Sequence, residues 1–285
     1  MKVAKSSKGE AEAELNSLVQ LRRWAMKGEE LEHLVDKAAD LIAKSKRIVV
    51  FTGAGMSTES GIPDFRSPGG IWSKFDPDEF TYQKFLSSPQ ARKKHWQFLK
   101  DPFISMEADP NPAHYAIAEL ERMGKLDCVI TQNVDNLHQK AGVPDGKVFE
   151  LHGNMRWVKC LSCGKRYPME EIRRRLEEGV DIPDCDACHG ILKPDGIFFG
   201  EALPAQVLSE ATRRSSSCNL FITIGSTLVV YPAAYMPSYA VEAGAKLIII
   251  NLMPTYMDRH AAVIIQTKAG EAMPKIMERV RAKLG

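Results

Sequence analysis

Four cysteines in two closely spaced pairs are the residues whose types and spacing point most clearly to chemistry. Cys160 and Cys163 form one C-x2-C pair, Cys185 and Cys188 form another, and 21 residues separate the two pairs. This spacing predicts a closed tetrahedral shell of four thiolates around one Zn²⁺. A full shell leaves no position for substrate, so the predicted zinc is structural. Two redox-active pairs are the alternative, although an intracellular chain with this spacing favours metal.

A glycine-containing loop follows an apolar run at residues 48–51. Gly53 and Gly55 allow a tight turn that brings the backbone close to a pyrophosphate. Thr58, however, stands where the third glycine of the G-x-G-x-x-G fingerprint belongs. The next predicted strand begins only at Cys128, so the compact unit of about 30 residues typical of dehydrogenases is absent. A tight turn without a ligand is the plainer alternative for this loop.

His152 is the histidine whose position most favours catalysis. It lies in the stretch FELHGN, directly before the cysteine-containing segment. A junction between two domains is where clefts form, and an imidazole can accept a proton near neutral pH. Position alone leaves a structural role open. His138, beside Leu137 in a predicted helix, is interpreted as structural.

The elements that must position these residues alternate between short apolar strands and helices. The strands lack the alternation of a half-exposed sheet, which predicts burial on both faces and therefore a parallel sheet with helices on either side. Residues 10–46, 112–123 and 232–243 are predicted to be helical. The strands are predicted at 47–52, 128–131, 220–224, 246–251 and 262–266.

Small and polar residues follow the predicted strands. Because ligands on such sheets bind beyond the carboxyl ends of the strands, these residues are expected to meet at one edge. Their amide and hydroxyl groups suit the ribose and phosphates of a nucleotide. They are Gly53 to Gly55, Gln132 to Asp135, Gly225 to Thr227, and Asn251.

Two stretches interrupt the alternation and define the predicted domain organisation. The fold class is α/β, a Rossmann-like parallel sheet domain with an inserted small zinc-binding domain and helical module. Residues 1–28 form an N-terminal helical extension. The sheet domain comprises 29–70, 106–154 and 196–285, and the small domain comprises 71–105 and 155–195.

Composition limits the classes of partner. Lys plus Arg number 38 and Asp plus Glu 36, for a net charge of +2. This balance predicts neither membrane nor sequence-specific nucleic acid as a partner. The run Arg173 to Arg175 is interpreted as a solvated helix face rather than a nucleic-acid contact. No apolar run approaches the ~20 residues of a membrane span and the first residues do not resemble a signal peptide, so a cytoplasmic location is expected.

Several motifs, in this order, resemble the sirtuin family of NAD-dependent protein-lysine deacylases. They are GAGMSTESGIPDFRS, TQNVDNLHQKAG, LHGN, the four cysteines, the IFFGE stretch at 197–201, the GSTLVVYP stretch at 225–232, and Asn251. The resemblance covers roughly residues 30–280. It implies that the glycine loop holds NAD so that the nicotinamide bond can be broken. Acetyl groups would leave protein lysines, giving nicotinamide and 2′-O-acetyl-ADP-ribose.

The same resemblance implies residue roles. His152 would be the general base, with Asn133 as the second catalytic residue. Gly200, Glu201, Val229 and Val230 would bind the acyl-lysine peptide as an added strand, and Phe199 would pack against the lysine stem. NAD contacts would come from Ala54, Gly55, Ser57, Thr58, Asp64, Phe65, Arg66, Gln132, Val134, Asp135, Gly225, Ser226, Thr227, Asn251 and Ala269.

Alternatives to deacetylation remain at this level. The same cleft could transfer ADP-ribose to protein, remove longer neutral acyl groups, or bind a nucleotide without chemistry. Sirtuins that remove succinyl or malonyl groups carry a Tyr-x-x-Arg pair in the helical module. Trp96 to Leu99 align with that pair, and an apolar wall offers no partner for a buried carboxylate. A neutral acyl group is therefore expected.

Overall fold

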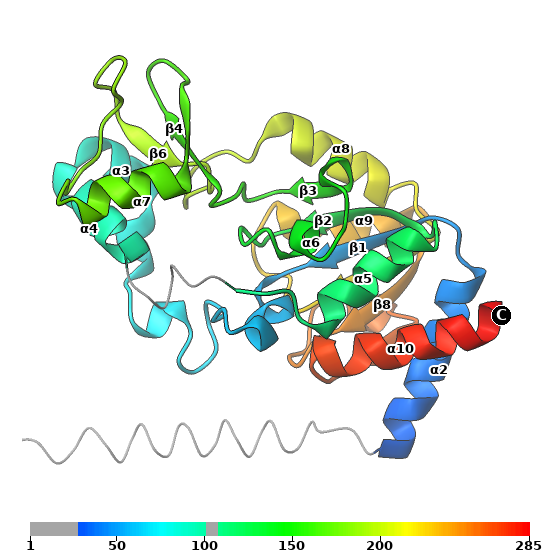
Figure 1. The fold of residues 1–285 in the computed structure, drawn as a ribbon. Helices are drawn as coiled ribbons and strands as arrows, with labels where there is room; N and C mark the ends of the chain where they lie inside the picture. Colours follow the sequence, from blue (N-terminus) through cyan, green and yellow to red (C-terminus); the bar gives the residue numbers. More distant parts are fainter. Residues whose placement is uncertain (1–27, 101–107) are drawn as a thin grey trace, which may run out of the picture.

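The structure is a computed structural model that describes residues 28–100 and 108–285. It consists of a large sheet domain and a small domain that projects from one side of it (Figure 1). The helix predicted for residues 10–46 is confirmed from Gly28 to Lys44 (α2). The rest of that prediction, and nearly all of the N-terminal extension, lies outside the described residues.

The large domain is built on a six-stranded sheet in the order β3-β2-β1-β7-β8-β9, with neighbouring strands parallel. Every residue of β1 and β7, at the centre of the sheet, is buried. This is the pattern that unbroken apolar runs predict, and it confirms the α/β fold class. The strands are β1 Ile48–Thr52, β2 Leu126–Thr131, β3 Val148–Glu150, β7 Leu220–Ile224, β8 Lys246–Ile250 and β9 Val263–Ile265.

Helices cover both faces of this sheet. The buried side chains of α2, α5 (Pro112–Arg122) and α10 (Ala269–Leu284) form one apolar cluster with one face. Those of α8 (Ala205–Ser215) and α9 (Met236–Glu242) join the cluster on the other face. In α5, Pro112 occupies the first turn and Asn111 caps it by accepting hydrogen bonds from two backbone N–H groups, which fixes where the helix begins.

One strand of the large sheet escaped prediction, as did the three short strands of the small domain, and several strand boundaries in the large sheet shift by one or two residues. β3 has only three residues, and it lies at the edge of the sheet, where it pairs with β2 alone. Phe149 and Glu150 are half-buried, so the segment lacks the continuous apolar run that marks the inner strands. β3 nevertheless matters for the site, because the chain turns from its end directly into His152.

The small domain combines a three-stranded antiparallel sheet in the order β5-β4-β6 with three helices. Its core contains Trp96, Tyr167 and Ile172, contributed by two separate stretches of the chain. The elements are α3 Tyr82–Ser87, α4 Pro89–Lys100, β4 Trp157–Cys160, β5 Arg166–Pro168, α7 Met169–Glu177 and β6 Leu192–Pro194.

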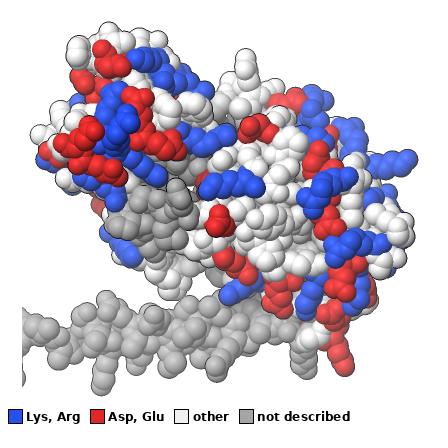
Figure 2. Space-filling model, viewed as in Figure 1, with Lys and Arg blue, Asp and Glu red and all other residues white. Residues whose placement is uncertain are grey.

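Charges of both signs are intermingled on the face shown in Figure 2, over the small domain and along α2 and α10. Arg175, in the basic run on α7, is paired with Glu171 one turn earlier on the helix. Among the described residues, no helix has the length and apolar character needed to cross a membrane.

Candidate active site

Two loops at the carboxyl edge of the sheet meet backbone to backbone. Gly55 donates a hydrogen bond from its N–H to the carbonyl of Gly225, at an N–O distance of 2.9 Å. A Cβ on Gly53 would lie 2.8 Å from that carbonyl, and one on Gly225 would lie 2.2 Å from the nitrogen of Met56. Gly225 also has a positive φ of 63°. The glycines are therefore required first by the packing of these loops against each other.

Hydrogen bonds between polar side chains connect the three loops that follow β1, β2 and β7. Ser57 Oγ donates to Asp135 Oδ2 at 2.7 Å, and Asn133 Nδ2 donates to Ser57 Oγ at 3.1 Å. Gln132 Nε2 donates to Ser226 Oγ at 2.8 Å. Burial raises the pKa of Asp135, an effect that the hydrogen bonds from Leu137 and Ser57 oppose. The sequence-predicted polar residues after three of the strands are thus brought together.

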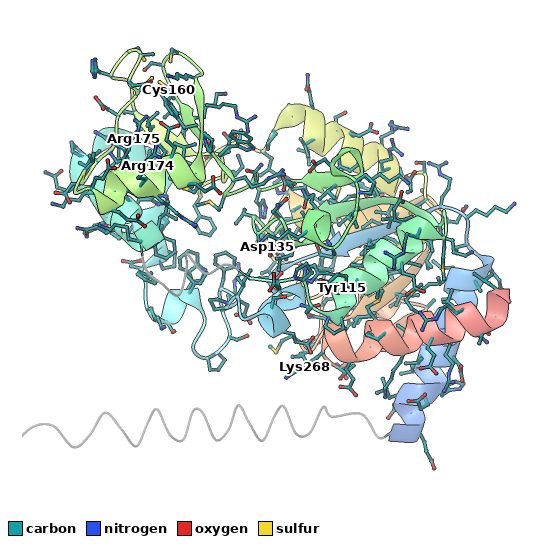
Figure 3. All side chains as sticks on the ribbon, in the orientation of Figure 1. Tyr115, Asp135, Cys160, Arg174, Arg175 and Lys268 are labelled. Atoms are coloured by element: carbon teal, nitrogen blue, oxygen red, sulfur yellow. The ribbon has the colours of Figure 1, made fainter. Side chains whose placement is uncertain are left out.

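The remaining predicted residues of this edge occupy varied positions. Thr58 donates its hydroxyl to the carbonyl of Gly55 at 3.1 Å, which closes the loop on itself. Ala54, Val134 and Thr227 are half-buried. Asn251, at the end of β8, is buried and donates Nδ2 to the carbonyl of Met253 at 2.7 Å. In Figure 3, Asp135 and Lys268, which directly precedes Ala269 at the start of α10, lie on one side of the sheet domain.

His152 lies where the sheet domain passes into the small domain. Its Nδ1 is 3.1 Å from the carbonyl oxygen of Gln132. Because a carbonyl can only accept, Nδ1 must carry the proton, which leaves Nε2 with a free lone pair. Burial lowers the pKa of His152, partly offset by this hydrogen bond, so the imidazole is neutral at pH 7. The geometry thus presents an unprotonated Nε2 that is able to act as a general base.

The loop carrying Asp64, Phe65 and Arg66 is held by Asp64. Its Oδ1 accepts hydrogen bonds from the backbone N–H groups of Arg66 and Ser67, at 2.9 and 2.7 Å. Arg66 itself is exposed. The ring of Phe65, which is 39% exposed, packs at a tilt against Trp72, with 5.3 Å between the ring centroids. Asp64 therefore shapes the loop, and Phe65 is the side chain that the loop presents.

A row of aromatic rings leads from this loop to the predicted peptide site. Trp72 lies 5.8 Å from Phe199 and 5.8 Å from Phe80, between ring centroids. Phe199 is 44% exposed and pairs by a β-bridge with Thr81. Val229 is exposed and Val230 half-buried on the loop after β7.

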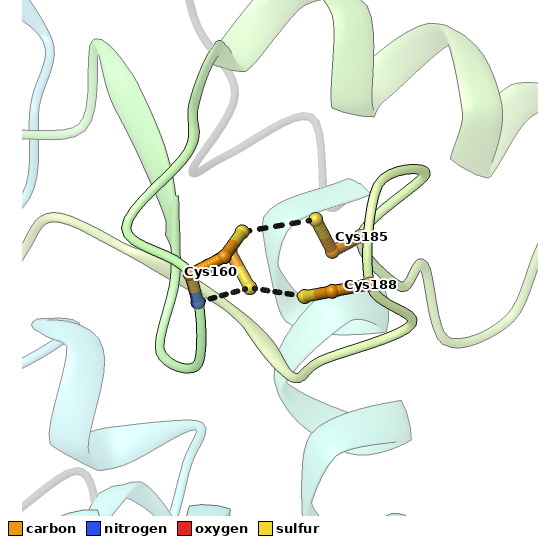
Figure 4. Close-up of side chains that lie close together, drawn as sticks. Cys160, Cys185 and Cys188 are labelled. Carbon is orange, nitrogen blue, oxygen red and sulfur yellow. Dashed lines mark hydrogen bonds between the residues drawn. The ribbon is translucent and has the colours of Figure 1, made fainter.

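The four cysteines fit one metal ion. Their Sγ atoms lie within 4.8 Å of one another, with Cys160 and Cys188 at 3.5 Å and Cys163 and Cys185 at 3.6 Å (Figure 4). Tetrahedral Zn²⁺ with Zn–S near ~2.3 Å requires sulfur separations of about 3.8 Å. A hydrogen bond from Tyr167 lowers the pKa of Cys185 to about 6, which favours the thiolate that a metal binds. Figure 3 shows Cys160 at the tip of the small domain, far from Asp135, which suits a structural metal.

Sequence reasoning missed two contacts around the site. Glu59, on the loop after Gly55, accepts a hydrogen bond from the N–H of Gly270 in the first turn of α10, at 2.7 Å. Lys193 forms a buried ion pair with Glu201, at 3.0 Å. Neither pair has a local sequence signal. A lysine between the apolar residues of β6 is nevertheless unusual, and it could have prompted a search for a buried acidic partner.

The fold and site together are those of a nucleotide-binding protein with a buried, neutral histidine between a parallel sheet and a metal-binding module. The chain belongs to the Sir2 family, whose family model matches residues 53–232. It is 48% identical over 253 residues to NAD-dependent protein deacylase 2 of Archaeoglobus fulgidus, covering 88% of this chain and 98% of that one. It is 45% identical over 251 residues to NAD-dependent protein deacetylase 1 of Pyrobaculum aerophilum, covering 88% and 96%.

A solved structure supports the same relationship. The structure described as Sir2 with a p53 peptide and NAD⁺ matches with a TM-score of 0.77 and 40% sequence identity, covering 86% of this chain and 97% of that one. Similarity of this extent over nearly the whole of each relative extends from the sheet domain through the cysteine module.

Proposed function

We propose that this protein is an NAD-dependent protein-lysine deacetylase that produces nicotinamide and 2′-O-acetyl-ADP-ribose. The observation that carries the proposal is the neutral His152, whose Nε2 is left unprotonated by the hydrogen bond from Nδ1 to Gln132. A binding module has no need of a base held in one tautomer at the junction of two domains. The curated relatives with deacetylase and deacylase names support the same conclusion.

The residues at the carboxyl edge fit NAD. The edge offers backbone without side chains at Gly53, Gly55 and Gly225, and a network of hydroxyl and amide groups beside it. When bound, NAD would supply a ribose whose bond to nicotinamide breaks and whose 2′-oxygen takes up the acyl group, with one water consumed. We assign Asn133, Asp135 and Ser57 to the nicotinamide half, and Ser226, Asn251 and the start of α10 at Ala269 to the adenosine half.

The chain's own groups then have separate tasks. Nε2 of His152 accepts the proton of a ribose hydroxyl, and burial keeps that nitrogen unprotonated at neutral pH. Phe65 places an apolar ring over the reacting centre and excludes water. The side chain of Asn133 is fixed by hydrogen bonds to the Gly53 carbonyl and to Ser57, both 3.1 Å. It can therefore act in the reaction without first rearranging.

The peptide is assigned to Gly200 and to the loop at Val229 and Val230, as a strand added between them. No hydrogen bond joins the N–H or C=O of Gly200 to another described residue, so both can pair with an added strand. Recognition through main-chain groups favours loose sequence preference. Phe199 is assigned to the lysine stem.

The acyl group is proposed to be neutral. Of the residues aligned with the Tyr-x-x-Arg pair, Trp96 and Leu99 lie in the core of the small domain, because that face of α4 packs on the zinc-binding segment. Phe98 instead contacts Phe80 at 4.8 Å, extending the aromatic row that ends at Phe199. Aromatic rings stabilise an acetyl or longer fatty chain and offer no partner for a carboxylate. Removal of longer neutral acyl groups is the alternative within this site.

The test is an incubation of the protein with NAD and an acetyl-lysine peptide, read by mass spectrometry. We expect loss of acetyl that depends on NAD, with 2′-O-acetyl-ADP-ribose appearing in equal amount. His152→Ala should reduce turnover by roughly 10²–10⁴-fold while NAD binding persists. His33→Ala, an exposed histidine on α2, is the matched control.

Other outcomes discriminate between the alternatives. ADP-ribose gained on protein with acetyl untouched would establish a transferase. Absence of NAD loss with every acyl peptide would leave a binding module. Faster removal of succinyl than of acetyl from one peptide sequence would contradict the neutral acyl group. The four clustered cysteines are free thiols, which favours a reducing compartment. We therefore propose the cytoplasm as the location of the protein.

A further inference from the structure

Lys193 is a buried lysine in β6 whose ammonium group is fully engaged. Its side chain is only 4% exposed. Nζ donates to the carbonyls of Pro194 and Gly196, at 2.9 and 2.7 Å, and lies 3.0 Å from Glu201 Oε2. It also lies 4.3 Å from the ring centroid of Phe198. Burial of an ammonium group is costly unless it is paired, and here every hydrogen bond and the ion pair are to the segment 194–201, while the ring of Tyr82 lies farther off, at 5.9 Å.

Glu201 faces inward and fastens the other end of that segment. Besides Lys193, the carboxylate accepts a hydrogen bond from the N–H of Phe198, at 2.9 Å. The N–H of Glu201 in turn donates to the carbonyl of Phe198, at 3.0 Å. The side chain of Glu201 is therefore used to close the turn, and only 17% of it is exposed.

The turn closed by this ion pair connects three parts of the site. The N–H of Ile197 donates to the carbonyl of His152, at 2.8 Å, and the carbonyl of Phe199 accepts from the N–H of Tyr82, at 2.9 Å. The segment is thus hydrogen-bonded to the proposed catalytic histidine through Ile197 and to the helical module through Phe199. Gly200, with no hydrogen-bond partner among the described residues, is left at its outer side.

We propose that Lys193 and Glu201 are positioning residues whose buried ion pair holds the backbone at Phe199 and Gly200 in the conformation that receives an acyl-lysine peptide. This inference rests on the proposed function for the identity of the ligand. It assigns the Glu201 side chain to the protein interior and not to the substrate. Neither residue touches the reacting atoms, so their effect is on peptide affinity, and NAD affinity should be left unchanged.

The experiment compares the wild type with Lys193→Met, Glu201→Gln and the double variant. The ion pair lines a cavity of about 500 Å³ beside α8, so water can reach the group left unpaired in each single variant. Peptide affinity is measured by fluorescence anisotropy of a labelled acetyl-lysine peptide, NAD affinity by calorimetry, and thermal stability in the same buffer. Lys93→Met is the matched control, because Lys93 pairs with Asp181 at the surface of the same domain, at 2.6 Å.

We expect each single variant to weaken peptide binding at least tenfold, to change NAD affinity less than twofold, and to lower the melting temperature. The double variant should recover thermal stability, since no unpaired charge remains, yet still bind the peptide at least tenfold more weakly. Recovery of peptide affinity together with stability would reduce the pair to a structural role and overturn the proposal. Unchanged peptide affinity in the single variants, or equal losses of affinity for NAD and for the peptide, would also overturn the proposal.

Failure of the proposed function is distinguishable from these results. Wild-type protein that binds the peptide without removing its acetyl group would contradict the deacetylase while still allowing the binding comparison. Wild-type protein that does not bind the peptide at all would overturn both.

Discussion

The sheet domain and the small domain are stabilised in different ways. In the sheet domain, β1 and β7 are buried along their whole length and covered by helices on both faces. In the small domain, the residues of β4 and β5 alternate between buried and exposed, and the apolar core is a single modest cluster. A domain as small as this one buries too little apolar surface to be stable on its own.

The difference shows where a metal is needed. Cys160 and Cys185 are fully buried and belong to the small domain's core cluster, so metal binding and core formation are one event there. Cys128 and Cys218 are buried in the sheet domain as well, but they lie apart from the four clustered cysteines and behave as small apolar residues. The following predictions test this contrast, in order of decreasing effect.

Removal of one zinc ligand should have the largest effect, and only on one domain. Cys160→Ser is expected to abolish zinc binding, which contributes about 10–16 kcal/mol of apparent free energy in zinc-finger peptides. The measurements are zinc content by mass spectrometry and hydrogen exchange resolved by segment. Exchange should rise across β4, α7 and β6 and stay low in β1 and β7. Cys218→Ser is the control, and one zinc per chain retained in Cys160→Ser would contradict the proposed site.

A cavity in the centre of the sheet should be the next largest effect. Ile222 in β7 is fully buried. Ile222→Ala is expected to lower the free energy of unfolding by about 2–5 kcal/mol. Urea denaturation followed by circular dichroism measures this loss. Leu284→Ala, at a side chain 48% exposed at the end of α10, should change little, and similar losses in both variants would show that burial does not set stability here.

Acid should destabilise the sheet domain through two buried histidines. Burial lowers the pKa of His138 to about 3 and that of His114 to about 4, while both titrate near ~6.5 when unfolded. Below pH ~6.5 the unfolded chain therefore binds more protons. Stability should be maximal above that pH and should fall by at most about 1.4 kcal/mol per pH unit for each histidine as the pH drops toward 4.

The variant His138→Asn isolates one of these contributions. Denaturant unfolding between pH 7 and 5 should show a shallower decline for His138→Asn than for the wild type, whatever its stability at pH 7. His33→Asn, at an exposed position, should keep the wild-type slope. Parallel curves for the wild type and His138→Asn would refute the assignment.

The smallest effect is expected at the surface where α2 meets α10. Glu32 pairs with Lys275 and Arg279, both at 3.1 Å, and all three side chains are at least 40% exposed. Glu32→Ala should lower the melting temperature only slightly, because solvent screens such pairs. The loss should shrink further in 0.5 M salt, as thermal denaturation would show. A large loss that salt does not change would indicate that Glu32 packs rather than pairs.

The sequence predicted the inner strands and most residues of the carboxyl edge for a definable reason. A strand buried on both faces must be apolar throughout, and parallel strands bring the residues that follow them to one edge. β3 was missed because Phe149 and Glu150 are only half-buried, so this short edge strand lacks the continuous apolar run of the inner strands. The pairs Glu59–Gly270 and Lys193–Glu201 were missed because tertiary packing, not local pattern, brings their partners together.

The tautomer of His152 also depends on tertiary packing and could not be predicted from the local sequence. The stretch FELHGN marked the histidine, but the carbonyl that fixes its proton belongs to Gln132, 20 residues earlier. Only the pairing of β2 with β3 brings that carbonyl within reach.

The meeting of Gly53, Gly55 and Gly225 has a consequence for redesign. Where two main chains touch with no side chain between them, no exchange of a larger for a smaller residue can adjust the spacing. The proposed NAD-binding half of the site is therefore fixed in shape. The proposed peptide-binding half contains aromatic rings, which can be exchanged. Attempts to change what this enzyme accepts should begin at Trp72, Phe80 and Phe98 and leave the glycines untouched.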